Sequence, residues 1–218
     1  MRKIVRLLAS LAPLAAFAAN AAGLDVRIVD QHGAAVADAV VTVVPRDAAP
    51  AAVPGHKPET KIIDQKNLTF VPYIEVFRPG DSVVFRNSDN TRHHVYSFSP
   101  VKAFEFVLKP GESSAPLALD KSGVVAVGCN IHDRMIAYLY ISDAPWIAHS
   151  GADGKVGFDA LPAGAYEVRV WHPRLRPNKP DLAQTATVLG SADPQTLTFT
   201  LSLLPDPRTQ FDREHTSY

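Results

Sequence analysis

The chain has 218 residues with 22 basic and 22 acidic side chains, so its formal net charge at pH 7 is zero. A chain without net charge lacks the strong field with which proteins hold nucleic acid or an anionic membrane surface, and we expect neither partner. Hydrophobic residues make up 46% of the sequence, which is enough for a packed core and argues against a wholly disordered chain. The 18 prolines and 12 glycines are spread along the sequence and favour short strands separated by turns.

Residues 1–22 have the pattern of a secretory signal peptide. Three basic residues fall within the first six positions, an apolar run covers 7–18, and Ala19-Asn20-Ala21 fits a small-x-small cleavage site. The apolar run is too short for a membrane span, and no later segment reaches that length. We therefore predict an exported, periplasmic protein without a membrane span in the mature chain; the alternative is a buried N-terminal helix.

After residue 22 the sequence predicts an all-β protein. Short runs of β-branched and aromatic residues alternate with turns such as Pro79-Gly80-Asp81, and no segment has a convincing helical period. The predicted strands lie at 24–29, 39–44, 62–63, 68–77, 82–86, 94–98, 104–108, 124–127, 136–141, 156–158, 166–171, 185–188 and 196–201. We expect the first two to form a hairpin, and we expect residues 205–218 to form a flexible tail.

Three metal-ligating side chains follow the strand predicted at 124–127. Cys129, His132 and Met135 place a thiol, an imidazole and a thioether within seven residues. Cys129 is the sole cysteine, so it is an intermolecular bridge, an inert buried thiol or a metal ligand. A plane of two histidines and a thiolate with a weak axial thioether is the electron-transfer copper pattern, although zinc also binds cysteine and histidine.

The second histidine of such a plane has to come from another loop. His93 and His94 follow the strand predicted at 82–86, and strand alternation turns their side chains to opposite faces. We therefore expect one of the two to be a ligand. His172 is another histidine that the sequence singles out, and we interpret it as a strand-end residue because no other ligand has a matching spacing.

Residues 60–143 resemble a cupredoxin. The resemblance rests on 68–72, on 79–87 and on the tight Cys-x-x-His-x-x-Met loop, which is more similar to amicyanin than to plastocyanin; it extends to exported proteins labelled methylamine-utilisation proteins. It implies a Greek-key β-sandwich that binds one type 1-like copper ion. The ligands that the resemblance implies are His93, which lies six residues after Asn87 as in the family's motif, and Cys129, His132 and Met135.

The resemblance also implies supporting roles and shows departures. Asn87 would contribute a hydrogen bond beside the copper, and His94 would fix the loop by hydrogen bonding. The family often has proline at the position of Ile131 and before the first histidine, where this chain has Arg92. Such changes leave every ligand in place and affect the reduction potential and the surface around the site.

The flanks, 24–57 plus 145–204, resemble one small transthyretin-type (carboxypeptidase-regulatory-like) β-sandwich. The resemblance rests on Val29–Val41 and on the turn-rich segment Ala152–Tyr166. It implies that the copper domain is inserted into a loop of this second domain, since domain insertion succeeds where termini lie close together. The alternative is a cupredoxin with unrelated β-rich extensions.

These features predict a one-electron carrier that exchanges electrons with redox partner proteins in the periplasm. We expect that the protein is not an enzyme, because four protein ligands leave no open position on the metal for a substrate. The first alternative is a periplasmic copper-binding or delivery protein that does not cycle between oxidation states. The second is a scaffold protein whose site stays empty, for which replacing Cys129 would leave function intact.

Overall fold

The computed structural model describes residues 22–47, 56–176, 182–189 and 194–209. The signal peptide expected at residues 1–22 lies outside these ranges except for Ala22, and so does the part of the expected tail after Thr209. The described residues form sixteen strands and one short 3-10 helix. These are β1 (Ala22–Asp30), β2 (Val40–Pro45), β3 (Thr60–Gln65), β4 (Phe70–Val71), β5 (Ile74–Phe77), β6 (Ser82–Asn87), β7 (His93–Ser99), β8 (Lys102–Leu108), β9 (Leu117–Ala118), β10 (Gly123–Cys129), β11 (Ile136–Ile141), β12 (Trp146–His149), β13 (Lys155–Leu161), β14 (Gly164–Trp171), β15 (Leu182–Val188), β16 (Gln195–Leu201) and η1 (Pro207–Thr209).

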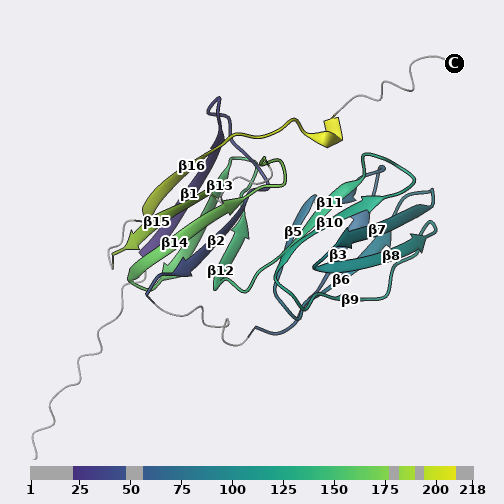
Figure 1. The fold of residues 1–218 in the computed structure, drawn as a ribbon, viewed down its shortest axis with the longest axis horizontal. Coiled ribbons are helices and arrows are strands. Elements are labelled where there is room, and N and C mark those ends of the chain that lie inside the picture. The colour runs from purple at the N-terminus through teal and green to yellow at the C-terminus, as the bar shows by residue number, and fades with distance from the viewer. Residues whose placement is uncertain (1–21, 48–55, 177–181, 190–193, 210–218) are drawn as a thin grey trace, which may run out of the picture.

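The strands form four sheets, arranged as two sandwiches that lie side by side (Figure 1). The inner sandwich contains β3 to β11, in sheets ordered β5-β11-β10-β7-β8 and β4-β3-β6-β9. The flanking sandwich contains β1, β2 and β12 to β16, in sheets ordered β13-β1-β16 and β12-β2-β14-β15. The chain thus enters the flanking sandwich, leaves it for the inner sandwich, and returns.

Alternating side chains build the core of the inner sandwich. Along β10 and β11, every second side chain is buried, as expected for strands with one face against a partner sheet. Phe85 on the opposite sheet stacks on Phe104 with ring centroids 5.2 Å apart. Cys129 and Met135 belong to this same core cluster, so the predicted metal loop begins and ends inside it.

The flanking sandwich differs in one respect from the sequence prediction. The first two strands were expected as a hairpin, but β1 pairs with β13 and in parallel with β16, whereas β2 pairs with β12 and β14. The hairpin expectation is wrong because both strands bury one face in the core between the sheets, which places them in opposite layers. Val26 on β1 and Val43 on β2 both belong to that core.

An aromatic and aliphatic cluster joins the two sandwiches. The ring of Trp171, at the end of β14, lies 5.8 Å from Tyr138 and 5.1 Å from Tyr140, both on β11. Val40 and Ile74 are buried beside them. Apolar burial and edge-to-face ring packing therefore hold the sandwiches together.

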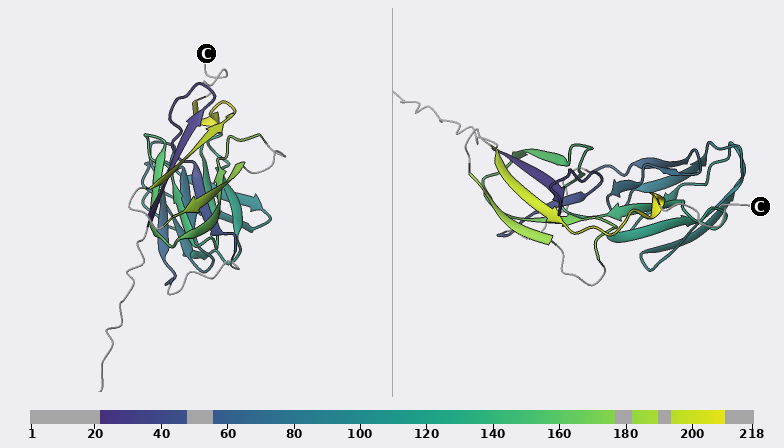
Figure 2. Two further views of the ribbon diagram at one scale, coloured as in Figure 1. Left: turned by 90° about the vertical axis from the view of Figure 1, so that its left-hand side faces the viewer. Right: turned by 90° about the horizontal axis from the view of Figure 1, so that it is seen from above.

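A segment after β16 returns to the inner sandwich and ends near it in the figures (Figure 2). Arg208 lies over the ring of Tyr73 at 3.6 Å and pairs with Asp206 at 2.6 Å. The sequence predicts a flexible tail from Pro205 onward, but the structure shows specific contacts through Arg208. The sequence pattern does not indicate this contact, because a cation over an aromatic face needs no hydrophobic signal.

The all-β prediction is confirmed. The run predicted at 68–77 is two strands in the structure, β4 and β5, separated at Pro72, which has no amide hydrogen for a sheet ladder. In the part of the chain that the structure describes, no helix has the length and apolarity of a transmembrane span.

Candidate metal centre

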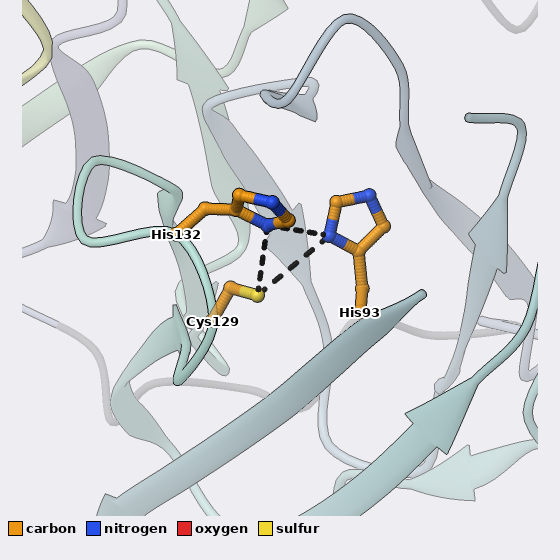
Figure 3. A group of neighbouring side chains, drawn as sticks. All are labelled: His93, Cys129 and His132. Atoms are coloured by element: carbon orange, nitrogen blue, oxygen red, sulfur yellow. Dashed lines mark hydrogen bonds between the residues drawn. The ribbon is translucent and has the colours of Figure 1, made fainter. Parts of the chain in front are cut away.

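Three of the side chains singled out by the sequence meet at one end of the inner sandwich. His93 begins β7, Cys129 ends β10, and His132 lies in the loop that follows, and Figure 3 shows their donor atoms facing one another. The alternation along β7 turns His93 into the core, where its side chain is fully buried. Among the described residues, this is the one group of three or more His, Cys, Asp or Glu side chains that could hold a metal ion.

The distances between the three donor atoms match a metal coordination sphere. The Cys129 Sγ lies 3.7 Å from Nδ1 of His93 and 3.8 Å from Nδ1 of His132, and the two Nδ1 atoms are 3.2 Å apart. Bonds of about 2.0 Å to nitrogen and about 2.3 Å to sulfur give ligand–ligand edges of roughly 3.3–3.7 Å. Two imidazoles and a thiol are also the ligand types that copper and zinc prefer, so the residues fit such an ion.

The loop from Cys129 to Met135 is closed at its base by backbone hydrogen bonds. The Cys129 amide donates to the Met135 carbonyl at 3.2 Å, and the Met135 amide donates to the His132 carbonyl at 3.1 Å. The Met135 side chain is buried in the core cluster that includes Cys129. Cys129, His132 and Met135 thus lie on one short, internally bonded loop, and His93 comes from β7.

The loop that carries His93 contains a carboxylate that the sequence analysis did not single out. Nε2 of His93, the nitrogen that faces away from Cys129, lies 2.9 Å from Oδ2 of Asp89. Asp89 is four residues before His93 on the same loop, and that spacing was the available signal. Hydrogen bonding at one nitrogen fixes the ring orientation and leaves the other nitrogen for a metal.

Asn87 and His94 lie near the three donor side chains, and their own side chains form hydrogen bonds to other groups. The Asn87 side chain donates to the carbonyls of Thr91 and Leu108, at 2.8 and 3.0 Å, and so holds the loop before His93. The His94 imidazole bonds to Glu105 at 2.8 Å on the outer face. The His94 backbone carbonyl accepts a 3.0 Å hydrogen bond from the Asn130 amide, which ties the two ligand-bearing loops together.

A charged pair braces the start of the same loop. Asp64 on β3 accepts hydrogen bonds from Arg86 at 2.6 Å and from the Ser88 hydroxyl at 2.9 Å. The Arg86 hydrogen bond, aided by Ser88, holds the pKa of Asp64 below its ordinary value despite partial burial. Asp64 is therefore ionised at neutral pH and fixes the strand end from which the His93 loop departs.

The site reaches the surface on one side. His132 is partly buried, whereas His93 and Cys129 are buried. Ile131, its neighbour, is 43% exposed. The imidazole edge of His132 is thus the part of the site nearest to solvent.

His172 takes no part in this site. It lies in the flanking sandwich after β14, and its Nδ1 accepts a hydrogen bond from the Arg174 amide at 3.1 Å. Burial, with smaller contributions from Arg174 and Arg208, lowers the pKa of His172 to about 4. This histidine is neutral at physiological pH and plays a packing role at the end of its strand.

No protein-family model and no curated protein matches the chain. Similar solved structures include amicyanin from Paracoccus versutus, at 15% identity and a TM-score of 0.34, covering 46% of this chain and 98% of amicyanin. A copper-containing nitrite reductase from Thermus scotoductus SA-01 has 22% identity and a TM-score of 0.36, covering 45% of this chain and 25% of the reductase. A purple cupredoxin from Nitrosopumilus maritimus has 20% identity and a TM-score of 0.33, covering 38% of this chain and 98% of that protein.

Proposed function

We propose that this chain is a periplasmic protein that binds one copper ion in a type 1-like site and carries single electrons between partner proteins. The observation that carries the proposal is the convergence of His93, Cys129 and His132, with donor atoms 3.2 to 3.8 Å apart. Met135 is proposed as the fourth, axial ligand, since it is buried beside Cys129.

When bound, copper would supply a one-electron couple, and the protein's part is to keep the donor atoms still. Strands β7 and β10 hold His93 and Cys129 in register, because Cys129 pairs with Val95 in the ladder. The short hydrogen-bonded loop fixes His132 and Met135 relative to Cys129. Ligands that do not move keep the same geometry in both oxidation states, which suits electron transfer better than substrate binding.

The partly exposed edge of His132 is the proposed route for the electron. It is the portion of the site closest to solvent, and the other two donor side chains are buried. We propose that redox partner proteins approach this edge. Two parts of the proposal rest on the sequence. They are export through the N-terminal signal peptide and membership of the exported proteins labelled methylamine-utilisation proteins.

The test is to load the purified mature chain with Cu(II) and to record its visible absorption and electron paramagnetic resonance spectra. We expect one copper per chain and an intense thiolate-to-copper band, both lost in Cys129→Ser. Circular dichroism of the variant checks that the fold is retained. A colourless protein that binds Cu(I) tightly would favour copper delivery, and a chain that binds no copper in either state would leave a scaffold function.

A further inference from the structure

The two nitrogens of the His93 imidazole have different partners. Nδ1 faces Cys129 and His132, at 3.7 and 3.2 Å, and Nε2 faces Oδ2 of Asp89 at 2.9 Å. The His93 side chain is fully buried, and the Asp89 side chain is 10% exposed. Asp89 thus presents a carboxylate to the far side of the imidazole in a site that water hardly reaches.

Asp89 is itself held in place by backbone amides from a separate loop. Its Oδ1 accepts from the Asn67 amide at 2.5 Å, and its Oδ2 accepts from the Leu68 amide at 3.1 Å. Asn67 and Leu68 both have positive φ angles, 55° and 54°, a conformation that non-glycine residues seldom adopt and that here aims their two amides at one carboxylate. The Asp89 amide in turn donates to Oδ1 of Asn87 at 3.0 Å.

The hydrogen bond to Asp89 specifies which nitrogen of the His93 ring carries the proton. A carboxylate is purely an acceptor, so its hydrogen bond to His93 requires a proton on Nε2. In the neutral imidazole that leaves the lone pair on Nδ1, which is the atom that faces Cys129 and His132. The backbone around Asn67 and Leu68 therefore sets the orientation of His93 through Asp89.

We infer that Asp89 is the positioning residue of the metal centre: it holds His93 with Nδ1 directed at the ion, and its negative charge favours Cu(II) over Cu(I). The inference rests on the proposed function for its copper part, and its ring-orientation part concerns the apo protein alone. A fixed anion near a buried ion stabilises the more highly charged oxidation state because the surroundings screen it poorly. Asp89 touches no ligand atom that faces the ion, so it acts through His93.

The next residue supplies a matched control. His94 bonds through Nε2 to Glu105 at 2.8 Å, a histidine–carboxylate pair of nearly the same length. Its ring faces the outer surface, and Glu105 is 62% exposed. Glu105→Gln therefore removes a carboxylate from an adjacent histidine without touching the side of β7 that faces Cys129.

The experiment compares Asp89→Asn, Asp89→Ala and Glu105→Gln in two measurements. In the apo protein, 15N NMR of the imidazoles at pH 8 should show the His93 proton on Nε2 in the wild type and in Glu105→Gln, and a mixture of tautomers in Asp89→Ala. In the copper-loaded protein, redox titration should show Asp89→Asn shifted about tenfold toward Cu(I), a rise of about 59 mV for one electron, with Glu105→Gln unchanged.

The outcomes separate this inference from the proposed function. If the wild type loads copper and Asp89→Asn shifts no more than Glu105→Gln, the charge role of Asp89 is overturned. If His93 keeps its proton on Nε2 in Asp89→Ala, the orientation role is overturned. If the wild type binds no copper, the proposed function fails, and the NMR result alone decides whether Asp89 orients His93. Asp89→Asn keeps the size of the side chain, so the test survives if Asp89→Ala does not fold.

Discussion

His93 and His94 are neighbours in the chain and belong to opposite sides of β7. The His93 ring is buried and faces Cys129, and the His94 ring faces outward to Glu105. Residues 93 and 94 begin a strand, and successive side chains of a strand point to opposite faces of the sheet. Two adjacent histidines therefore have separate environments, and their replacement should have separate effects.

We expect His93→Ala to abolish coloured copper binding and His94→Ala to preserve it. His93 contributes one of the three converging donor atoms, whereas His94 contributes only a backbone carbonyl to the site. Equilibrium dialysis with Cu(II), followed by absorption spectroscopy, measures both properties. Equal copper binding and equal spectra in the two variants would exclude His93 as a ligand.

Replacement of Met135 by leucine should change the copper spectrum and leave the fold intact. Leucine has a similar volume, so we expect a loss of less than about 1.5 kcal/mol in the free energy of unfolding. Removing a weak sulfur donor should shift the redox balance toward Cu(I), since the axial ligand tunes the potential of such sites. Leu139→Met, in the same core cluster, is the control for core repacking. A spectrum and potential identical to the wild type would make Met135 a core residue only.

The stability of the flanking sandwich should depend on the protonation of His172. Burial lowers the pKa of His172 to about 4 in the folded protein, whereas the histidine of the unfolded chain is protonated near pH 6.5. The part of the free energy of unfolding that depends on neutral His172 is fully present above pH 6.5. It is lost as the pH falls toward 4, and the loss is about 3 kcal/mol because each pKa unit corresponds to about 1.4 kcal/mol.

Urea unfolding between pH 7 and pH 4 measures this loss. His172→Gln should flatten the dependence of the free energy of unfolding on pH. The glutamine oxygen can accept the hydrogen bond from the Arg174 amide, and it does not titrate in this range. His149→Gln replaces an exposed histidine and should keep the wild-type slope. The same slope in all three proteins would show that His172 is not the titrating group.

Trp171 should couple the unfolding of the two sandwiches. Its ring packs on Tyr138 and Tyr140 across the cluster that joins them. We expect Trp171→Ala to separate one calorimetric transition into two and to cost roughly 3 kcal/mol, the lower range for removal of a large aromatic side chain. Trp146→Ala is the comparison, because Trp146 packs on Tyr166 within the flanking sandwich and should lower its stability without separating the transitions. Unchanged cooperativity in Trp171→Ala would contradict the coupling.

The sequence predicts the class of the fold because alternation and turn residues are local signals. The strands around Pro79-Gly80-Asp81 follow this rule, and Gly80 has the positive φ of 98° that favours glycine in such a turn. Pairing is less accessible: β1 meets β16 across about 170 residues, and no local pattern encodes that partner. The hairpin expected for β1 and β2 fails for this reason.

The candidate site divides in the same way. Cys129, His132 and Met135 are visible in the sequence because three ligand types share one short loop. Asp89 is harder to find, since its spacing of four residues from His93 is a weak signal that also fits an ordinary polar loop. Its role depends on the amides of Asn67 and Leu68, which reach it from a different loop only after the sheets have packed.

The parallel pairing of β1 with β16 has a consequence for the order in which the protein is made. The first described strand of the flanking sandwich has to wait for the last one, since its partners β13 and β16 are synthesised after the whole inner sandwich. Every strand of the inner sandwich lies between residues 60 and 141, so this unit can close on the growing chain while β1 still has an open edge. The centre that holds His93 and Cys129 can then form before the flanking sandwich is complete. We therefore expect mutations in β16 to harm assembly of the flanking sandwich without preventing the inner one from forming.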